Sequence, residues 1–466
     1  MNQKILIKNG HLWTGEANFT ADIFIEGGKI RAIGSDLSKA YSADETLDAS
    51  GLYVFPGGID PHTHMELPFM GTFSSDDFET GTLAALHGGT TSIIDFAIQK
   101  KGDPIKACVK DWHERADKKV VADYALHVAV TDYNDKTRQE IPELINDGIP
   151  SFKAFMAYKN VLMIDDRQLL DLLETSKKYG GLISVHAENG DLVDHLIQKF
   201  RSEGKLTPHY HPLAHAAEAE EEAASRAMDL ANYVGTDIYI VHTTYKGVLD
   251  RAIEKMRRGQ RVYIETCPQY LCLDDSCYDE PNFGGAKYVM SPPIRKKADQ
   301  EALWAGIKGG YVHTVGTDHC PFNMKGQKEM GKDDFSKIPN GGPCVENRIE
   351  VCFSEGVAKG RISMDRFVQV MCVNPARIFG MPGKGTLAIG ADADIVIFDP
   401  NEKHTLSAKT HHMRVDYNMF EGWEVTGRVK TVLSNGRVAI RNGKADQIEK
   451  GAGKFIKRKL FRSSEL

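Results

Sequence analysis

The 466-residue sequence lacks long apolar runs and has few cysteines. No stretch approaches the ~18 consecutive apolar residues of a transmembrane helix, and the amino-terminal MNQKILIKNGHLW has no apolar core of secretory length. None of the eight cysteines forms a CxxC pair, which argues against a disulfide framework and against a zinc finger. We therefore expect a protein of the reduced cytoplasm.

Positive charge is not in excess either. The formal net charge is −6, so neither nucleic acid nor an anionic membrane is expected as a partner. The one strongly basic stretch is GKFIKRKLFR at residues 453–462, which we expect to be a solvated terminus. The dinucleotide-binding pattern GxGxxG is also missing.

The two ends of the chain resemble each other. Residues 3–36 and 385–445 alternate apolar and polar side chains around glycine turns, as half-exposed antiparallel strands do, and Asn435–Gly436 is a hairpin signal. We predict one small β-sandwich domain assembled from residues 1–55 and 380–466, the basic tail included. A larger domain, residues 56–379, would be inserted between its halves.

The middle of the chain repeats a different pattern. Eight short apolar runs, from YVFPGGIDPHTH to HTVGTDHC, alternate with amphipathic stretches such as DDRQLLDLLETSKKYG. Near-continuous apolar strands alternating with helices indicate a parallel sheet of the α/β class, and eight units indicate a closed (β/α)₈ TIM-like barrel. A doubly wound open sheet would also alternate, but it usually carries a glycine-rich loop after its first strand. The count favours the barrel.

Polar side chains mark the ends of the expected strands, where a barrel places its reacting groups. The first strand ends at His62 and His64, the fifth at His186, the sixth at His242 and the eighth at Asp318. Each alone is an ordinary hydrogen-bonding residue, but five at equivalent positions favour a metal site. A site without cysteine suits catalytic zinc or a neighbouring metal. Five ligands suffice for two ions ~3.5–4 Å apart if a further ligand bridges them.

Lys153 occupies the fourth expected strand, within PSFKAFMAY. A lysine is almost never fully buried without a partner, and burial disfavours its charged form. Beside two dications a protonated lysine would be repelled, whereas a lysine carbamate, formed with carbon dioxide, is an anion with two oxygens. Charge balance therefore suggests that carboxylated Lys153 bridges the two metals. A neutral structural lysine would explain the burial but not the position.

Several motifs together resemble the D-hydantoinase/dihydropyrimidinase family of cyclic amidohydrolases, within the amidohydrolase superfamily. They run along nearly the whole chain: GGIDPHTH, FKAFMAYK, HAENGD, VHTT, ETCPQYL, SPPIR, TDHCPF and IPNGGPCVENR. The resemblance implies a metal-bearing (β/α)₈ barrel with a β-sandwich, usually assembled as a homotetramer. It also implies hydrolysis of a cyclic amide, either a 5,6-dihydropyrimidine or a 5-substituted hydantoin, to an N-carbamoyl amino acid.

The resemblance further assigns roles to individual residues. It implies that two zinc ions are bound by six residues, one of them N6-carboxylysine at Lys153: His62, His64, Lys153, His186, His242 and Asp318. Tyr158 would hydrogen-bond the carbonyl under attack, and Ser291 and Asn340 would hold the imide of the ring through their main-chain groups. A metal-bridging hydroxide would attack the carbonyl while Asp318 transfers the proton to the departing ring nitrogen.

Other readings of the same motifs stay open. Dihydroorotase and allantoinase belong to the same superfamily, but dihydroorotase must grip a substrate carboxylate, typically with an arginine two residues after HxH. Here His64 is followed by Met65 and Glu66, which argues against that substrate. A non-catalytic scaffold resembling the neuronal dihydropyrimidinase-like proteins is a further alternative, although those proteins have lost metal ligands and every ligand position is filled here.

The remaining histidines are expected to have supporting or structural roles. His319 is a candidate to support the site from behind, whereas ordinary structural roles are expected for two other groups: His209, His211 and His215, and His411 with His412. The segment HYHPLAHAAEAEEEAASR lacks the Arg-Pro-Pro that relatives often show, and we expect it to contact no proposed ligand. Leu67, Phe69 and Phe155 are candidates to shape the pocket for the ring substituent.

Overall fold

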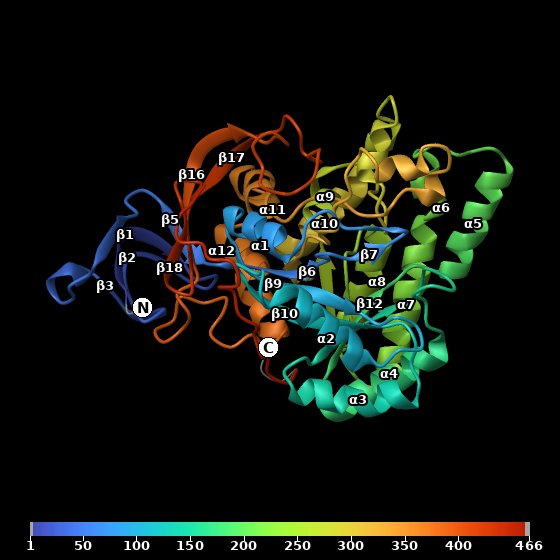
Figure 1. Ribbon diagram of the computed structural model, residues 1–466, viewed down its shortest axis with the longest axis horizontal. Helices are drawn as coiled ribbons and strands as arrows, with labels where there is room; N and C mark the ends of the chain where they lie inside the picture. The colour runs from blue at the N-terminus through green and yellow to red at the C-terminus, as the bar shows by residue number, and fades with distance from the viewer. Residues whose placement is uncertain (1–2, 462–466) are drawn as a thin grey trace.

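The computed structural model describes residues 3–461. A barrel with its helices lies on one side, and a sheet built from both ends of the chain, blue and red, lies on the other (Figure 1). Among the described residues, no helix is both long and apolar enough to cross a bilayer.

The barrel consists of eight parallel strands within the described range, in the sheet order β15-β14-β13-β12-β11-β10-β9-β6. Its ends approach each other where Thr63 bridges His319 and the His64 amide donates to the His319 carbonyl at 2.8 Å. The predicted (β/α)₈ fold is confirmed. The strands are β6 (Gly58–Thr63), β9 (Thr90–Ile98), β10 (Asp123–Val130), β11 (Ser151–Phe155), β12 (Leu182–His186), β13 (Ile238–Ile240), β14 (Val262–Thr266) and β15 (Thr314–Val315).

Helices cover the barrel, and their ends follow local capping chemistry. For example, α4 (Asp166–Tyr179) begins after Asp165, whose carboxylate accepts from the Gln168 amide, and ends at Gly180 in the left-handed conformation. The other helices are α1 (Phe78–His87), α2 (Ile105–Ala116), α3 (Asp135–Asn146), α5 (Gly190–Ser202), α6 (Tyr210–Ala214), α7 (Ala217–Val234), α8 (Lys246–Arg257), α9 (Pro268–Cys272), α10 (Lys297–Gly309), α11 (Arg348–Cys352), α12 (Met364–Val368) and α13 (Asn374–Ile378). The π-helical turns η6 (Phe353–Ala358) and η7 (Gln369–Val373) extend α11 and α12.

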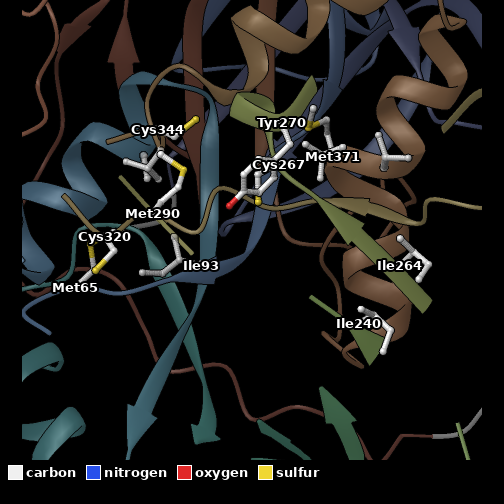
Figure 2. Close-up of a cluster of buried hydrophobic side chains, with 14 of the residues drawn as sticks. Met65, Ile93, Ile240, Ile264, Cys267, Tyr270, Met290, Cys320, Cys344 and Met371 are labelled. Atoms are coloured by element: carbon white, nitrogen blue, oxygen red, sulfur yellow. The ribbon is translucent and has the colours of Figure 1, made fainter. Parts of the chain in front are cut away.

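The main core lies between the barrel strands and these helices. It is built from buried aliphatic and aromatic side chains together with cysteine and methionine. Figure 2 shows part of it, with Ile240 and Ile264 on the neighbouring strands β13 and β14 and with Met290 and Cys320 from loops. Sulfur-containing side chains adapt to irregular gaps, which suits the transition from regular strands to loops.

The second sheet combines the two ends of the chain. Strand β1 pairs with β2, β4 and β5, and β5 pairs with β16, so that amino- and carboxy-terminal strands share one sheet. Its apolar side chains form a separate core. The predicted β-domain from both termini is confirmed as a mixed sheet, although the exact domain boundaries stay a prediction. The strands are β1 (Lys4–Trp13), β2 (Asn18–Glu26), β3 (Lys29–Gly34), β4 (Glu45–Asp48), β5 (Tyr53–Pro56), β16 (Ile395–Thr405), β17 (Glu424–Ser434), β18 (Arg437–Arg441) and β19 (Lys444–Ala445).

The first expected barrel strand, YVFPGGIDPHTH, is two strands in different sheets. β5 pairs with β1 and β16 of the terminal sheet, whereas β6 pairs with β9 of the barrel. The break falls at Gly57, where an added Cβ would lie 2.1 Å from Thr91 Oγ1. An apolar run carries no mark of which sheet each half joins, and the close approach at Gly57 separates the halves.

The basic tail is not a solvated terminus over residues 454–461. The Tyr124 amide of β10 donates to the Lys454 carbonyl, and the Tyr124 carbonyl accepts from the Ile456 amide. Arg458 donates to the Leu126 carbonyl and to Ser151 Oγ. Ile456 and Arg458 are 7% and 4% exposed. Ile456 packs in a small core with residues at the amino-terminal ends of barrel strands. Ile456 and Arg458 thus face the barrel, whereas Lys457 and Lys459 are exposed.

Candidate metal centre and substrate pocket

The predicted ligand side chains lie at the carboxyl ends of the barrel strands. His62 is on β6, Lys153 on β11 and His186 at the end of β12, whereas His242 and Asp318 lie in the loops just after β13 and β15. His242 and Asp318 have positive φ angles of 36° and 53°. A left-handed backbone costs a non-glycine residue on the order of 1–2 kcal/mol. The surrounding fold therefore holds these turns in place at the site.

One group of ligand atoms gathers around Asp318. Its Oδ1 lies 3.1 Å from Nε2 of His62 and 3.1 Å from Nε2 of His64. The ligand atoms of the three residues lie within 4.8 Å of one another. Nζ of Lys153 is 3.0 Å from the same Nε2 of His62. An imidazole pair with a carboxylate is a donor set typical of zinc.

A second group lies beside the first. Nδ1 of His186 is 2.9 Å from Nε2 of His242, and the His242 ring stacks on His62 with centroids 5.3 Å apart. The structure thus brings together all six residues proposed as ligands. The two groups share a boundary at His62 and Lys153, as expected for neighbouring metal positions.

Lys153 is enclosed and forms no ion pair with a carboxylate among residues 3–461. Its side chain is 1% exposed, and Nζ lies 4.4 Å and 4.8 Å from the ring centroids of Phe96 and Phe155. Burial lowers the pKa of Lys153 to about 8. A lysine in this environment is an amine of reduced basicity that lies next to imidazole nitrogens.

Two buried glutamates orient the histidines from behind, and the sequence analysis missed both. Nδ1 of His62 donates to Oε1 of Glu265 at 2.7 Å, and Nε2 of His186 donates to Oε2 of Glu188 at 2.8 Å. Because each glutamate takes the proton-bearing nitrogen, the other ring nitrogen presents its lone pair to the centre. Facing lone pairs fit a cation, so the donors present suit two divalent metals.

The segment HYHPLAH supports the site indirectly. His215 donates from Nδ1 to Glu188 at 2.9 Å, and Nε2 of His211 donates to the Met290 carbonyl at 2.7 Å. Both side chains are buried. Within residues 3–461 no hydrogen bond joins this segment to a proposed ligand, as expected, but His215 contacts Glu188, the carboxylate that holds His186.

The other histidines behave as expected. Nε2 of His319 contacts Asp76 at 3.0 Å, and its Nδ1 accepts from the Cys344 amide, so this ring fixes the loop after β15. His411 and His412 line a separate cleft near the terminal sheet. Neither belongs to the ligand group.

The proposed substrate residues line a pocket of about 480 Å³ next to the ligands. Nδ2 of Asn340 donates to Oγ of Ser291 at 3.0 Å. Burial and the nearby Glu188 raise the pKa of Tyr158, which keeps its phenol protonated and able to donate. Tyr158 adopts a φ of 61°, which turns the chain sharply after β11. These three residues therefore present polar groups to one wall of the pocket.

Much of the remaining lining is apolar. It includes all three residues singled out from the sequence, Leu67, Phe69 and Phe155, together with Ile98 and Leu162. The rings of Phe69 and Tyr158 pack edge to face with centroids 5.6 Å apart. A pocket lined by candidate metal ligands, by polar residues and by apolar side chains suits a small polar ring with a hydrophobic substituent.

Comparison with known proteins agrees with this geometry. The model of the amidohydrolase family matches residues 53–439. The chain belongs to that family. It is 48% identical to the D-hydantoinase of Geobacillus stearothermophilus over 98% of this chain and 97% of that protein. It is 42% identical to the dihydropyrimidinase of Rattus norvegicus, covering 98% and 89%.

A solved relative shares the whole architecture of this amidohydrolase. The crystal structure of dihydropyrimidinase from Brevibacillus agri NCHU1002 superposes with a TM-score of 0.97 at 49% identity, over 99% of this chain and 100% of that one. The resemblance to the D-hydantoinase/dihydropyrimidinase group is thereby confirmed, and the protein is an enzyme that hydrolyses cyclic amides. The alternative of a non-catalytic scaffold protein is therefore rejected.

Proposed function

We propose that this amidohydrolase opens the ring of 5,6-dihydropyrimidines or 5-substituted hydantoins and releases N-carbamoyl amino acids. The observation that carries the proposal is the position of the pocket. Its floor is the ligand group of His64, Lys153 and Asp318, and its walls are Ser291 with Asn340 and the apolar side chains. The D-hydantoinase and dihydropyrimidinase names of the relatives support both substrate classes.

Two divalent metal ions, zinc in our proposal, would be held by the two ligand groups. His62, His64 and Asp318 would hold one ion, and His186 and His242 the other. Carboxylation of Lys153 would form an N–C bond to carbon dioxide with loss of one proton, giving an anion that serves both positions. When bound, the ions would lower the pKa of a water molecule towards neutrality and polarise the carbonyl under attack.

The chain's own groups would bind and orient the ring. In the described structure, residues 3–461, the main-chain N–H and C=O groups of Ser291 and Asn340 make no hydrogen bonds. An imide offers an acceptor, a donor and a second acceptor in a row, which such free main-chain groups can match. The pocket would then be specific for imides, because a ring without this acceptor–donor–acceptor pattern would leave main-chain groups of Ser291 and Asn340 unpaired.

Proton movements would involve Tyr158 and Asp318. The Tyr158 phenol would donate to the carbonyl oxygen as negative charge develops on it. A carboxylate oxygen of Asp318 would accept the proton of the attacking water and deliver it to the departing ring nitrogen. The C–N bond breaks as that nitrogen is protonated, so the proton lost by water is the one gained by the product.

The pocket favours an uncharged ring over dihydroorotate. Of the described residues that line it, Lys153 is the single lysine or arginine, and it is committed to the metal site in this proposal. Glu66, where dihydroorotases typically carry arginine, lies against Lys119 and Arg115 instead. A substrate carboxylate would have no guanidinium to pair with, and allantoin would present its ureido chain to an apolar wall.

A substrate panel tests the function. The purified protein, supplied with zinc and bicarbonate, would be assayed with dihydrouracil, hydantoin, 5-phenylhydantoin, allantoin and dihydroorotate, with chiral separation of the carbamoyl products. We expect turnover of the first three and less than a hundredth of that rate with the last two. Selective hydrolysis of dihydroorotate or allantoin would overturn the proposal. We also propose a homotetramer, which sedimentation of the same sample would check.

A further inference from the structure

A second buried lysine lies behind the substrate wall. Lys328 begins the short 3₁₀ turn η4 (Lys328–Gly331) and is 0% exposed. Its Nζ donates three hydrogen bonds, to the carbonyls of Val289, Pro339 and Gly341 at 2.8, 2.7 and 2.7 Å. All three protons of an ammonium group are therefore used, and each goes to the main chain.

The three acceptors belong to the two loops that carry the proposed imide-binding residues. Val289 lies two residues before Ser291, and Pro339 and Gly341 flank Asn340. The Gly341 amide also donates to the Val289 carbonyl at 3.0 Å. Lys328 thus joins loops that are about fifty residues apart in the sequence, at the place where they form one wall.

This arrangement sets the direction of the neighbouring peptide groups. The Pro339 carbonyl, which accepts from Lys328, fixes the peptide group before Asn340, and the Gly341 amide, which donates to the Val289 carbonyl, fixes the peptide group after it. The main-chain groups of Ser291 and Asn340 make no hydrogen bonds within residues 3–461, and both residues line the pocket. The Lys328 ammonium therefore occupies the carbonyls of Val289, Pro339 and Gly341 and leaves the main-chain groups of Ser291 and Asn340 available to a ligand.

Burying a lysine among neutral acceptors is costly. Among the described residues no acidic side chain forms an ion pair with Lys328, and burial lowers its pKa to about 7. A glutamine or an ordered water could cap one or two carbonyls at lower cost, but neither has three donors in one group. Two separate loops direct three carbonyls at this position, and the lysine ammonium can donate to all three of them.

We propose that Lys328 is a positioning residue for the imide of the substrate: its ammonium group clamps the loops at 289–291 and 339–341 so that the main-chain groups of Ser291 and Asn340 match the ring. This inference rests on the proposed function. Lys328 itself does not line the pocket, so it acts through these loops and makes no contact with the reacting atoms.

Steady-state kinetics with Lys328→Met tests the role. The substitution keeps the length and burial of the side chain but removes all three donors. We expect KM for the wild type's best cyclic imide to rise at least tenfold, kcat to change less than threefold, and metal content to equal that of the wild type. Lys325→Met, an exposed lysine three residues earlier, should leave both constants unchanged.

A graded variant distinguishes positioning from a general structural role. Lys328→Gln retains two N–H donors, so its KM should fall between those of the wild type and Lys328→Met. An unchanged KM in Lys328→Met would overturn the proposal, as would a parallel loss of kcat and metal, or failure of both variants to fold. If wild type and Lys325→Met open no cyclic imide, the proposed function itself fails and this inference falls with it.

Discussion

Nδ1 of His62 and Oε1 of Glu265 lie 2.7 Å apart with both side chains fully buried. Glu265 also accepts from the Tyr239 phenol and from the His242 amide. One carboxylate therefore fixes a proposed ligand of one metal position and the backbone of a ligand of the other. Such partners of metal-bound histidines influence affinity nearly as strongly as the ligands do.

We predict that Glu265→Gln weakens metal binding by 10- to 100-fold. The amide can present its NH₂ group to Nδ1 and would then shift the proton of His62 onto Nε2, where it blocks the lone pair. Competition with a chromogenic chelator measures the affinity. Glu301→Gln, an exposed glutamate paired with Arg361, is the matched control. Equal affinities in the two variants would refute the role given to Glu265.

The docked tail gives a prediction about stability. Ile456→Ala should lower the free energy of unfolding by about 2–4 kcal/mol, because it leaves a cavity among buried side chains at the base of the barrel. Lys457→Ala, exposed in the same segment, should change it by less than about 0.5 kcal/mol. Denaturant titration measures both. If the two variants were equally stable, the tail would not be docked in solution.

A third prediction concerns the pH dependence of stability. His87 stacks on His412 with ring centroids 3.3 Å apart, and burial together with His412 lowers the pKa of His87 to about 3. Above the unfolded pKa of roughly 6.5, His87 is neutral in both states and contributes no pH dependence. As pH falls below that value the unfolded chain gains a proton that the folded one does not, so stability is lost progressively down to about pH 3.

His87→Gln should therefore lose less stability than the wild type between pH 7 and pH 5, by up to about 2 kcal/mol. Any release of metal over this range affects both proteins, so the difference between them isolates His87. His195→Gln, at an exposed position on α5, should follow the wild type. Identical pH dependence of all three in denaturant titrations would contradict the shifted pKa.

The barrel could be predicted, and six candidate ligands could be placed at one end of it, because these signals are local. Each candidate lies within an apolar run or just after one, and eight such runs define the fold. Glu265 and Glu188 escaped notice because a carboxylate inside a strand or just after it has no periodic signature. The role of each glutamate is visible only from the histidine that it contacts in the folded structure, His62 for Glu265 and His186 for Glu188. The docking of Ile456 was missed for the same reason, since the surface that receives the tail exists only in the folded barrel.

The central claim is that Lys153 completes a two-metal hydrolytic site, and metal content measured together with ring opening in Lys153→Ala tests it most directly. Lys159→Ala, an exposed lysine just after Tyr158, is the control and should keep about two metal ions per chain and wild-type turnover. We predict that Lys153→Ala loses metal and activity together and that short carboxylates such as acetate restore part of both. Retention of both metals and full turnover by Lys153→Ala would contradict the account.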